Sequence, residues 1–141
     1  MAHQRITIIE DDEILAKVMT EELEERGFQI FRAKDGVEGL ELVTDKKPDL
    51  VLLDLLMPRK NGFSVLEELK ANPATAAIPV IILSMLGHDD EIKRGLKLGA
   101  NDYIVKSQHA AGEIVDKIEE FFGQEQHPEA KKPTLPARAK R

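Results

Sequence analysis

Apolar and polar positions follow two different periods along this chain. Five short apolar runs, several of them rich in isoleucine, valine and leucine, have the length and composition of β-strands. The segments between them carry apolar residues every three or four positions, the period of an α-helix with one buried face. We therefore predict strands at residues 5–9, 28–32, 50–53, 79–83 and 102–105. The expected helices cover residues 13–26, a segment from Asp35 and Gly36 to just before Pro48, and residues 61–71, 89–98 and 112–122.

Glycine residues mark two of the expected helix ends. Gly27 and Gly99 directly follow the first and fourth helical segments, and glycine commonly ends a helix because it adopts left-handed backbone angles without strain. The apolar positions of each helix then define its buried face. In the first helix, the residues expected to point inward are Ile14, Leu15, Val18, Met19 and Leu23.

The alternation of five strands with five helices predicts an α/β fold, in which a five-stranded parallel sheet has helices on both faces. Residues 50–53 (LVLL) and 79–83 (PVIIL) are almost entirely apolar, as expected of strands that are covered on both sides. We therefore expect these two strands near the middle of the sheet.

The composition fits one soluble domain and excludes several classes of function. The chain has 141 residues and no cysteine, so disulfides, thiol nucleophiles and cysteine-based zinc sites are impossible. No apolar run approaches the roughly 18 residues that a membrane span requires, and the N-terminal residues lack the pattern of a signal peptide. These features are compatible with a cytoplasmic protein that makes no contact with membranes.

Charge is unevenly distributed along the chain. The net charge is −6, but residues 124–141 hold five basic and two acidic side chains, which leaves −9 for the preceding residues. An acidic body argues against nucleic-acid binding, because phosphate backbones require a basic face. Residues 124–141 also contain three prolines and no aromatic residue. We therefore expect one domain over residues 4–123, followed by a disordered basic tail.

Polar residues directly follow four of the five expected strands. They are, in chain order, the acidic run Glu10, Asp11 and Asp12, then Asp54, Ser84 and Lys106. In open α/β sheets, ligands bind outside the carboxyl ends of the strands, which all meet at one edge. We therefore expect these carboxylates, the hydroxyl and the amine to form a single site.

This combination of groups suits phosphoryl transfer to a carboxylate. Clustered carboxylates repel one another unless a cation lies among them or a proton is shared, and hard oxygen ligands suit Mg²⁺. A carboxylate can attack phosphorus to give an aspartyl-phosphate, while a metal neutralises charge on the transferring group. Lys106 would pair with one phosphate oxygen, and Ser84 would donate a hydrogen bond to another. No general acid–base pair for an external substrate is evident, so we do not expect an enzyme beyond its own phosphorylation and dephosphorylation.

Four motifs make the chain resemble the receiver domains of two-component response regulators, over about residues 4–123. They are IIEDDEIL at 8–15, DLVLLDLLMPRKNG at 49–62, PVIILS at 79–84 and GANDYIVK at 99–106. The resemblance implies the flavodoxin-like, CheY-like fold with the strand order 2-1-3-4-5, and Mg²⁺ as the cofactor.

The resemblance also implies the residues that take part in phosphorylation. Asp54 resembles the phosphoryl acceptor, and Ser84 and Lys106 resemble the hydroxyl and the amine that act beside it. Ser84 and Tyr103 resemble the pair of residues that change conformation when the acceptor is phosphorylated.

The metal ligands are implied in the same way. Asp11 resembles the main metal-binding carboxylate, and Glu10 its partner, usually acting through water. Asp54 and the backbone carbonyl of Leu56 would complete the protein ligands. Asp12 falls one position later, and we expect it to cap the N-terminus of the first helix instead.

The resemblance implies two kinds of protein partner, one that donates the phosphoryl group and one that receives the signal. The phosphoryl donor would be a histidine kinase or a phosphotransfer protein. A downstream target would bind the face formed by the fourth helix, the fifth strand and the fifth helix, to which Lys93, Arg94 and Lys97 add positive charge. No output domain is recognisable, so we expect a stand-alone regulator, with a receiver fragment of a longer regulator as the alternative.

Four positions depart from the usual pattern of the family. Ser107 replaces the proline after Lys106, and since a cis bond without proline costs about 2.5–4 kcal/mol, we expect a trans peptide bond there. Leu56 and Leu86 cannot orient a hydrolytic water, which predicts a long-lived aspartyl-phosphate. Met85 replaces a small residue and is expected to crowd the phosphate or to restrict the entry of small donors.

Three functions from other classes are less well supported by the sequence. A magnesium-dependent phosphohydrolase with an aspartyl nucleophile favours aspartate at position 56, where this chain has leucine. A flavin-binding electron carrier would need a loop rich in Ser, Thr and Gly after the first strand, where the acidic residues 10–13 would repel a phosphate. A scaffold that no longer takes phosphate is favoured only by Met85 and Ser107.

Overall fold

The computed structural model describes residues 3–57 and 60–126 of the chain. Strands and helices alternate throughout these ranges, with one short 3₁₀ helix (η1) before the last α-helix. In chain order the elements are β1 (Arg5–Ile9), α1 (Glu13–Glu25), β2 (Gln29–Ala33), α2 (Gly36–Lys46), β3 (Leu50–Leu53), α3 (Gly62–Ala71), β4 (Val80–Ser84), α4 (Asp89–Lys97), β5 (Asp102–Val105), η1 (Lys106–Gln108) and α5 (Ala111–Gln126).

The elements lie close to their predicted positions. Strands β1, β3 and β5 have the expected bounds, whereas β2 and β4 begin and end one residue later than expected. For β2 the reason is that the Phe28 N–H still bonds to the Leu23 carbonyl at the end of α1. Gly27 and Gly99 have φ angles of 96° and 116°, so both supply the left-handed turn expected after a helix.

The last helix is longer than its sequence pattern indicated. Helix α5 continues to Gln126, so residues 124–126, expected to begin the disordered tail, belong to the helix instead. These residues carry no proline, and a helix that is already packed extends easily at its end. The rest of the predicted tail lies outside the described residues. Within the described ranges, no helix is both long enough and apolar enough to cross a membrane.

All five strands pair in parallel, in the order β2-β1-β3-β4-β5. This is the predicted order, with β1, β3 and β4 in the interior of the sheet. Ile9 lies opposite Leu53, and Leu53 opposite Ile82, so β1 and β3 end at the same level and β4 ends two residues beyond it. The residues that follow these strands are therefore brought to one edge.

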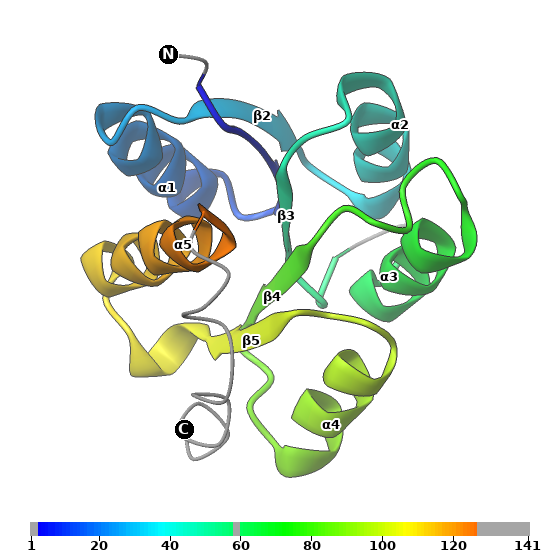
Figure 1. The fold of residues 1–141 in the computed structure, drawn as a ribbon. Helices are drawn as coiled ribbons and strands as arrows, with labels where there is room; N and C mark the ends of the chain where they lie inside the picture. Colours follow the sequence, from blue (N-terminus) through cyan, green and yellow to red (C-terminus); the bar gives the residue numbers. More distant parts are fainter. Residues whose placement is uncertain (1–2, 58–59, 127–141) are drawn as a thin grey trace.

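Helices cover both faces of the sheet and form two separate apolar cores (Figure 1). Helices α1 and α5 lie on one side, where Met19, Leu23 and Ile118 pack against Ile8 and other strand residues. Helices α2, α3 and α4 lie on the other side, where the α2 residue Val43 and several α3 residues belong to the second core. The central strands contribute alternate residues to the two cores, which explains their nearly continuous apolar sequence.

The buried face of α1 differs from the one expected. Ile14 was expected to point inward, but its side chain is 78% exposed. The buried residues of this helix are Ala16, Met19 and Leu23, which recur at the helical period. Ile14 precedes Ala16 by two positions, which is about 200° around the helix, so it must face the opposite side. An apolar side chain therefore lies in solvent at the start of α1.

Candidate active site

Three carboxylates meet at the carboxyl edge of the sheet. Glu10, Asp11 and Asp54 each place a carboxylate oxygen within 4.8 Å of the others. The parallel pairing of β1 with β3 brings them together, because the Asp54 N–H bonds to the Ile9 carbonyl at 3.0 Å and continues the ladder by one residue. As hard oxygen donors on a shared edge, they match the ligands that Mg²⁺ and Mn²⁺ prefer. The donor set thus fits a divalent cation.

Asp12 does not join this cluster. Its side chain accepts hydrogen bonds from the backbone N–H groups of Ile14 and Leu15, at 3.0 and 3.1 Å. It is therefore the N-cap of α1, as the sequence predicted.

Two of the three carboxylates are buried. Glu10 is 3% exposed and Asp54 4% exposed, whereas Asp11 lies in solvent. Burial, together with the nearby charge of Asp54, raises the pKa of Glu10 to about 7, against the opposing effect of Lys106. Burial also raises the pKa of Asp54, although the positive charge of Lys106 opposes the shift. The site therefore gains stability when positive charge enters it.

Lys106 supplies one positive charge within the site. Its Nζ lies 2.8 Å from Oε1 of Glu10 and 3.6 Å from Oδ2 of Asp54. Lys106 begins η1 directly after β5, and all peptide bonds of the described residues are trans, including the bond before Ser107. The missing proline therefore does not prevent the lysine from reaching the carboxylates.

Ser84 and Tyr103 meet at the backbone of one residue, Leu86. The fully buried Ser84 hydroxyl oxygen accepts the Leu86 N–H at 3.2 Å, while the Tyr103 hydroxyl donates to the Leu86 carbonyl at 2.5 Å. Burial, and next the charge of Glu91, raises the pKa of Tyr103 to about 12, so its hydroxyl stays protonated and can donate. The β4–α4 loop is thus held from two sides by these hydroxyls.

Three apolar residues closely follow Asp54 or Ser84 in the sequence, namely Leu56, Met85 and Leu86. Leu56 and Met85 are 52% and 56% exposed, respectively, whereas Leu86 packs partly against the second core. The Leu56 N–H donates to Oδ1 of Asp54 at 3.3 Å, so the backbone of this residue touches the site while its side chain extends into solvent.

Sequence patterns missed one residue of the site, Arg32. Its guanidinium donates two hydrogen bonds to the backbone carbonyl of Glu10, from Nε at 3.1 Å and from Nη2 at 2.7 Å. An arginine near the end of a strand is not distinctive, and the contact spans 22 residues, so no local signal identifies it.

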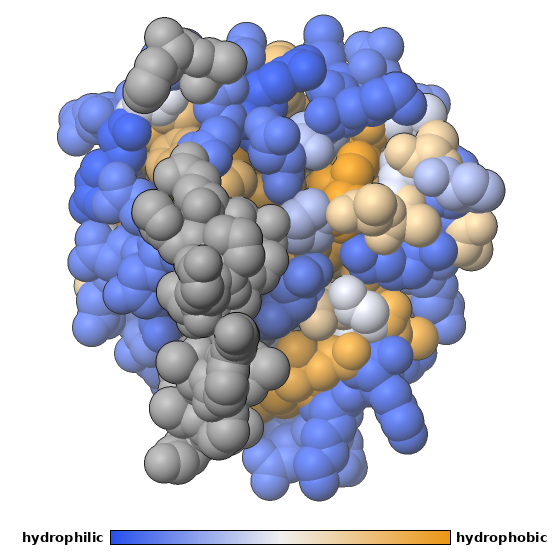
Figure 2. All heavy atoms as spheres, in the orientation of Figure 1, coloured by the Kyte–Doolittle hydropathy of each residue, from blue (hydrophilic) through white to orange (hydrophobic). Residues whose placement is uncertain are grey.

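A groove lies over α4, β5 and the end of η1 and reaches Lys117 of α5. It has a volume of about 570 Å³ and is lined by apolar residues such as Ile92 and Leu96 together with Tyr103 and Lys117. Figure 2 shows a mostly hydrophilic surface with several apolar areas, one of which lies between β5 and α4. Arg94 is not among the residues that line this groove, and its guanidinium lies 4.0 Å from the ring centre of Phe63 on α3.

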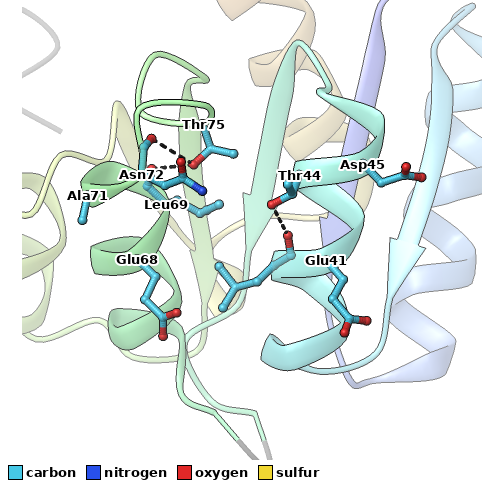
Figure 3. A pocket seen from close by; sticks show the side chains of 9 residues that line it. Glu41, Thr44, Asp45, Glu68, Leu69, Ala71, Asn72 and Thr75 are labelled. Atoms are coloured by element: carbon cyan, nitrogen blue, oxygen red, sulfur yellow. Dashed lines mark hydrogen bonds between the residues drawn. The ribbon is translucent and has the colours of Figure 1, made fainter.

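A second cavity, of about 810 Å³, lies between α2 and α3, away from the acidic cluster (Figure 3). Its two threonine hydroxyls are engaged locally, Thr44 with the Leu40 carbonyl and Thr75 with the Leu69 carbonyl. Glu41, Asp45 and Glu68 also line the cavity, but among the described residues around it no basic side chain accompanies these carboxylates, so we do not assign the chemistry to it.

Comparison with known proteins agrees with this geometry. Residues 6–119 match the family described as the response regulator receiver domain. The chain is 38% identical over 102 residues to the DNA-binding dual master transcriptional regulator RpaA of Synechocystis sp., an alignment that covers 72% of this chain and 42% of that protein. It is 37% identical over 102 residues to Protein PilH of Pseudomonas aeruginosa, covering 72% of this chain and 84% of PilH.

The chain thus spans less than half the length of RpaA but most of PilH. Among solved structures, the Mn²⁺-bound form of response regulator Rcp1 superimposes with a TM-score of 0.75 at 27% identity, covering 84% of this chain and 94% of that one.

Proposed function

The chain belongs to the response regulator receiver domain family, and from that premise we propose that it is a phosphorylation-controlled switch whose acceptor is Asp54. The observation that carries the proposal is the position of the Asp54 carboxylate. It is buried beside Lys106 and two further carboxylates, at the edge of the sheet where strand-end residues converge. This arrangement combines a nucleophile, a cation and a metal-binding group within one site.

Receiver domains bind a divalent metal in an acidic site, and we assign Mg²⁺ to the cluster of Glu10, Asp11 and Asp54. The backbone carbonyl of Leu56 would complete the protein ligands. When bound, Mg²⁺ would neutralise charge on the transferring phosphoryl group. Because Glu10 and Asp54 are buried together, the same cation would also relieve their mutual repulsion.

The phosphoryl donor is a phosphohistidine on a histidine kinase or a phosphotransfer protein. A carboxylate oxygen of Asp54 attacks phosphorus, the new O–P bond forms, and the P–N bond to the imidazole breaks with its electron pair returning to nitrogen. Lys106, now bonded to Glu10, turns to a phosphate oxygen. The Ser84 hydroxyl donates a hydrogen bond to another phosphate oxygen.

The output follows from the contact that Ser84 and Tyr103 share. When Ser84 turns to the phosphate, it no longer accepts the Leu86 N–H, and the anchor of Tyr103 on the Leu86 carbonyl loosens with the loop. The groove over α4 and β5, which Tyr103 lines, then changes shape. We assign this face to a downstream target protein, so signalling occurs by protein contact.

The proposal extends to the setting of the protein. The domain works in the cytoplasm, and its catalysis is limited to its own phosphorylation and dephosphorylation. Nucleic acid is not its partner, since the residues before position 124 carry a net charge of −9.

Phosphate uptake tests the function directly. The protein is incubated with Mg²⁺ and a small phosphodonor, and the intact mass is recorded for wild type and for Asp54→Asn. We expect one phosphoryl group on wild type and none on the variant. If neither a small donor nor a phosphorylated histidine kinase modifies wild type, the chain is a phosphate-independent scaffold and the proposal is wrong.

A further inference from the structure

Arg32 connects the edge strand of the sheet to the acidic cluster. It lies on β2, opposite Ile8 of β1, and its side chain reaches forward to the carbonyl of Glu10. Both hydrogen bonds come from a charged group, which makes them stronger than bonds between neutral groups. A carbonyl oxygen has two lone pairs, so this acceptor is fully engaged by one side chain.

The contact fixes a peptide group that belongs to two of the three carboxylate residues. The Glu10 N–H bonds to the Ala33 carbonyl at 3.0 Å, so β2 holds this residue at both its N–H and its C=O. The bonded carbonyl is part of the peptide group that joins Glu10 to Asp11. Its orientation therefore sets the direction in which the chain leaves Glu10 and the point from which the Asp11 side chain starts.

Asp11 depends on this backbone contact more than Glu10 does. The Glu10 carboxylate has its own partners, Lys106 at 2.8 Å and the Asp12 N–H at 3.1 Å. Asp11 is exposed, and among the described residues its side chain has no hydrogen-bond or ion-pair partner. Only the backbone can place its carboxylate near the others before a cation arrives.

We propose that Arg32 is a positioning residue of the divalent-metal site, which preorganises Asp11 and Glu10 by fixing the peptide group between them. The inference rests on the proposed function, because it takes Glu10, Asp11 and Asp54 as the metal ligands. Removing a residue that orients a metal ligand typically weakens metal affinity 10- to 100-fold. We expect a loss of roughly this size when Arg32 is replaced.

The positive charge of Arg32 has an effect of opposite sign. A cation beside the site repels Mg²⁺, so removing only the charge tightens metal binding, whereas removing the hydrogen bonds weakens it. Arg32→Met and Arg32→Gln both remove the charge. They differ because the Gln amide nitrogen occupies the place of Nε and retains one bond to the Glu10 carbonyl. The comparison of these two variants therefore isolates the hydrogen bond.

The test is a titration of the ¹⁵N-labelled full chain with Mg²⁺, followed by amide NMR. We expect Arg32→Met to bind Mg²⁺ about tenfold more weakly than wild type or worse, and Arg32→Gln to recover part of the loss. In the metal-free spectra, the amide ¹⁵N shift of Asp11 should move in the Met variant and return toward wild type in the Gln variant. A role in overall stability alone would not produce this local, graded change.

Lys17→Met is the matched control. Lys17 lines the same surface cavity beside α1 as Arg32, and within residues 3–57 and 60–126 it makes no hydrogen bond or ion pair. This variant loses an equivalent charge near the site and should bind Mg²⁺ at least as tightly as wild type.

Arg32→Met that binds Mg²⁺ as tightly as Arg32→Gln, or more tightly, overturns the inference while leaving the proposed function intact. If wild type itself binds no Mg²⁺, both the proposed metal site and this inference are wrong. If the Met variant does not fold, Arg32→Gln decides alone: weaker binding than wild type supports positioning, and tighter binding overturns it.

Discussion

The apolar side chain of Leu56 sits where a polar group could direct water to a phosphorylated Asp54. Its backbone N–H already bonds to Oδ1 of Asp54, while its side chain is half exposed beside the site. Nothing at this position can activate a water molecule, so attack on an aspartyl-phosphate should be slow.

We predict that Leu56→Asn shortens the lifetime of the aspartyl-phosphate by roughly tenfold or more, because the amide can orient the attacking water. The lifetime is measured from the decay of the phosphorylated mass after the donor is removed. Leu56→Ala is the control, since it removes the same apolar bulk without adding a polar group, and it should change the lifetime much less. Rapid decay of wild type, or an Asn variant that decays like wild type, would contradict the explanation.

Glu10 gives the metal-free protein an unusual dependence of stability on pH. Its pKa rises from 4.5 to about 7 on folding, mainly through burial. Between these values the folded state holds a proton that the unfolded state has released, so the contribution of Glu10 to stability falls as pH rises from 4.5 to about 7.

Glu10→Gln removes this dependence. In the presence of a chelator, we expect the free energy of unfolding of the variant to gain about 2 kcal/mol relative to wild type between pH 5 and pH 8. Urea unfolding at several pH values measures the difference. A difference that is constant over this range would show that Glu10 is not protonated in the folded protein.

At the scale of the elements, the start of α3 is fixed by close contact with the segment after β3 that carries Asp54. A Cβ atom added to Gly62 would lie 2.4 Å from the Asp54 carbonyl oxygen and 2.6 Å from Cα of Leu55. Both atoms belong to the backbone of the segment after β3, so neither can move aside as a flexible side chain would. Only glycine allows α3 to begin this close to the acceptor.

We therefore expect Gly62→Ala to lower the free energy of unfolding by about 1–3 kcal/mol, the usual cost of overpacking. It should also slow phosphorylation, because the carbonyl in contact belongs to Asp54. Gly123→Ala in α5 is the control, since an added Cβ meets no atom within 4 Å there, and alanine should stabilise the helix by about 0.5–1 kcal/mol. Urea unfolding compares the two variants. Equal changes in their free energies of unfolding would show that the close contact at Gly62 does not matter for stability.

At the scale of the whole molecule, the acidic cluster and the groove over α4 and β5 are connected through one backbone segment. Ser84 and Tyr103 lie on neighbouring strands, β4 and β5, and their hydroxyls bind the two polar groups of Leu86. Under the proposed function, a movement of Ser84 toward a phosphate would therefore reach Tyr103 through Leu86 without any displacement of the sheet.

On phosphorylation, we expect amide hydrogen exchange to change along residues 85–105 and to stay constant around Thr44 and Thr75 in the cavity between α2 and α3. Ser84→Ala should still gain phosphate at a reduced rate but lose most of the change near Tyr103, because the hydroxyl that moves is absent. Exchange measured on phosphorylated and unphosphorylated protein tests this, and an undiminished change in the variant would rule out the route through Ser84.

Local sequence patterns were enough to predict the elements and the edge at which the strand-end side chains meet, and the family resemblance added the sheet order. The spacing of apolar residues, an N-cap such as Asp12 and a glycine after a helix are all local properties of the sequence. The order of the strands then places Asp54 and Lys106 at one edge of the sheet. These features can be predicted because each depends on residues that are close in the sequence, or on a topology with few alternatives.

The contacts within the site and the exposure of individual side chains became apparent only in the folded structure. Lys106 lies closer to Glu10 than to Asp54, Arg32 binds a backbone carbonyl 22 positions away, and Ile14 faces solvent rather than the core. Each depends on strand register, helix rotation and side-chain reach between distant segments. Such distances are set by the packing of the whole domain, which the local pattern of apolar and polar residues does not contain.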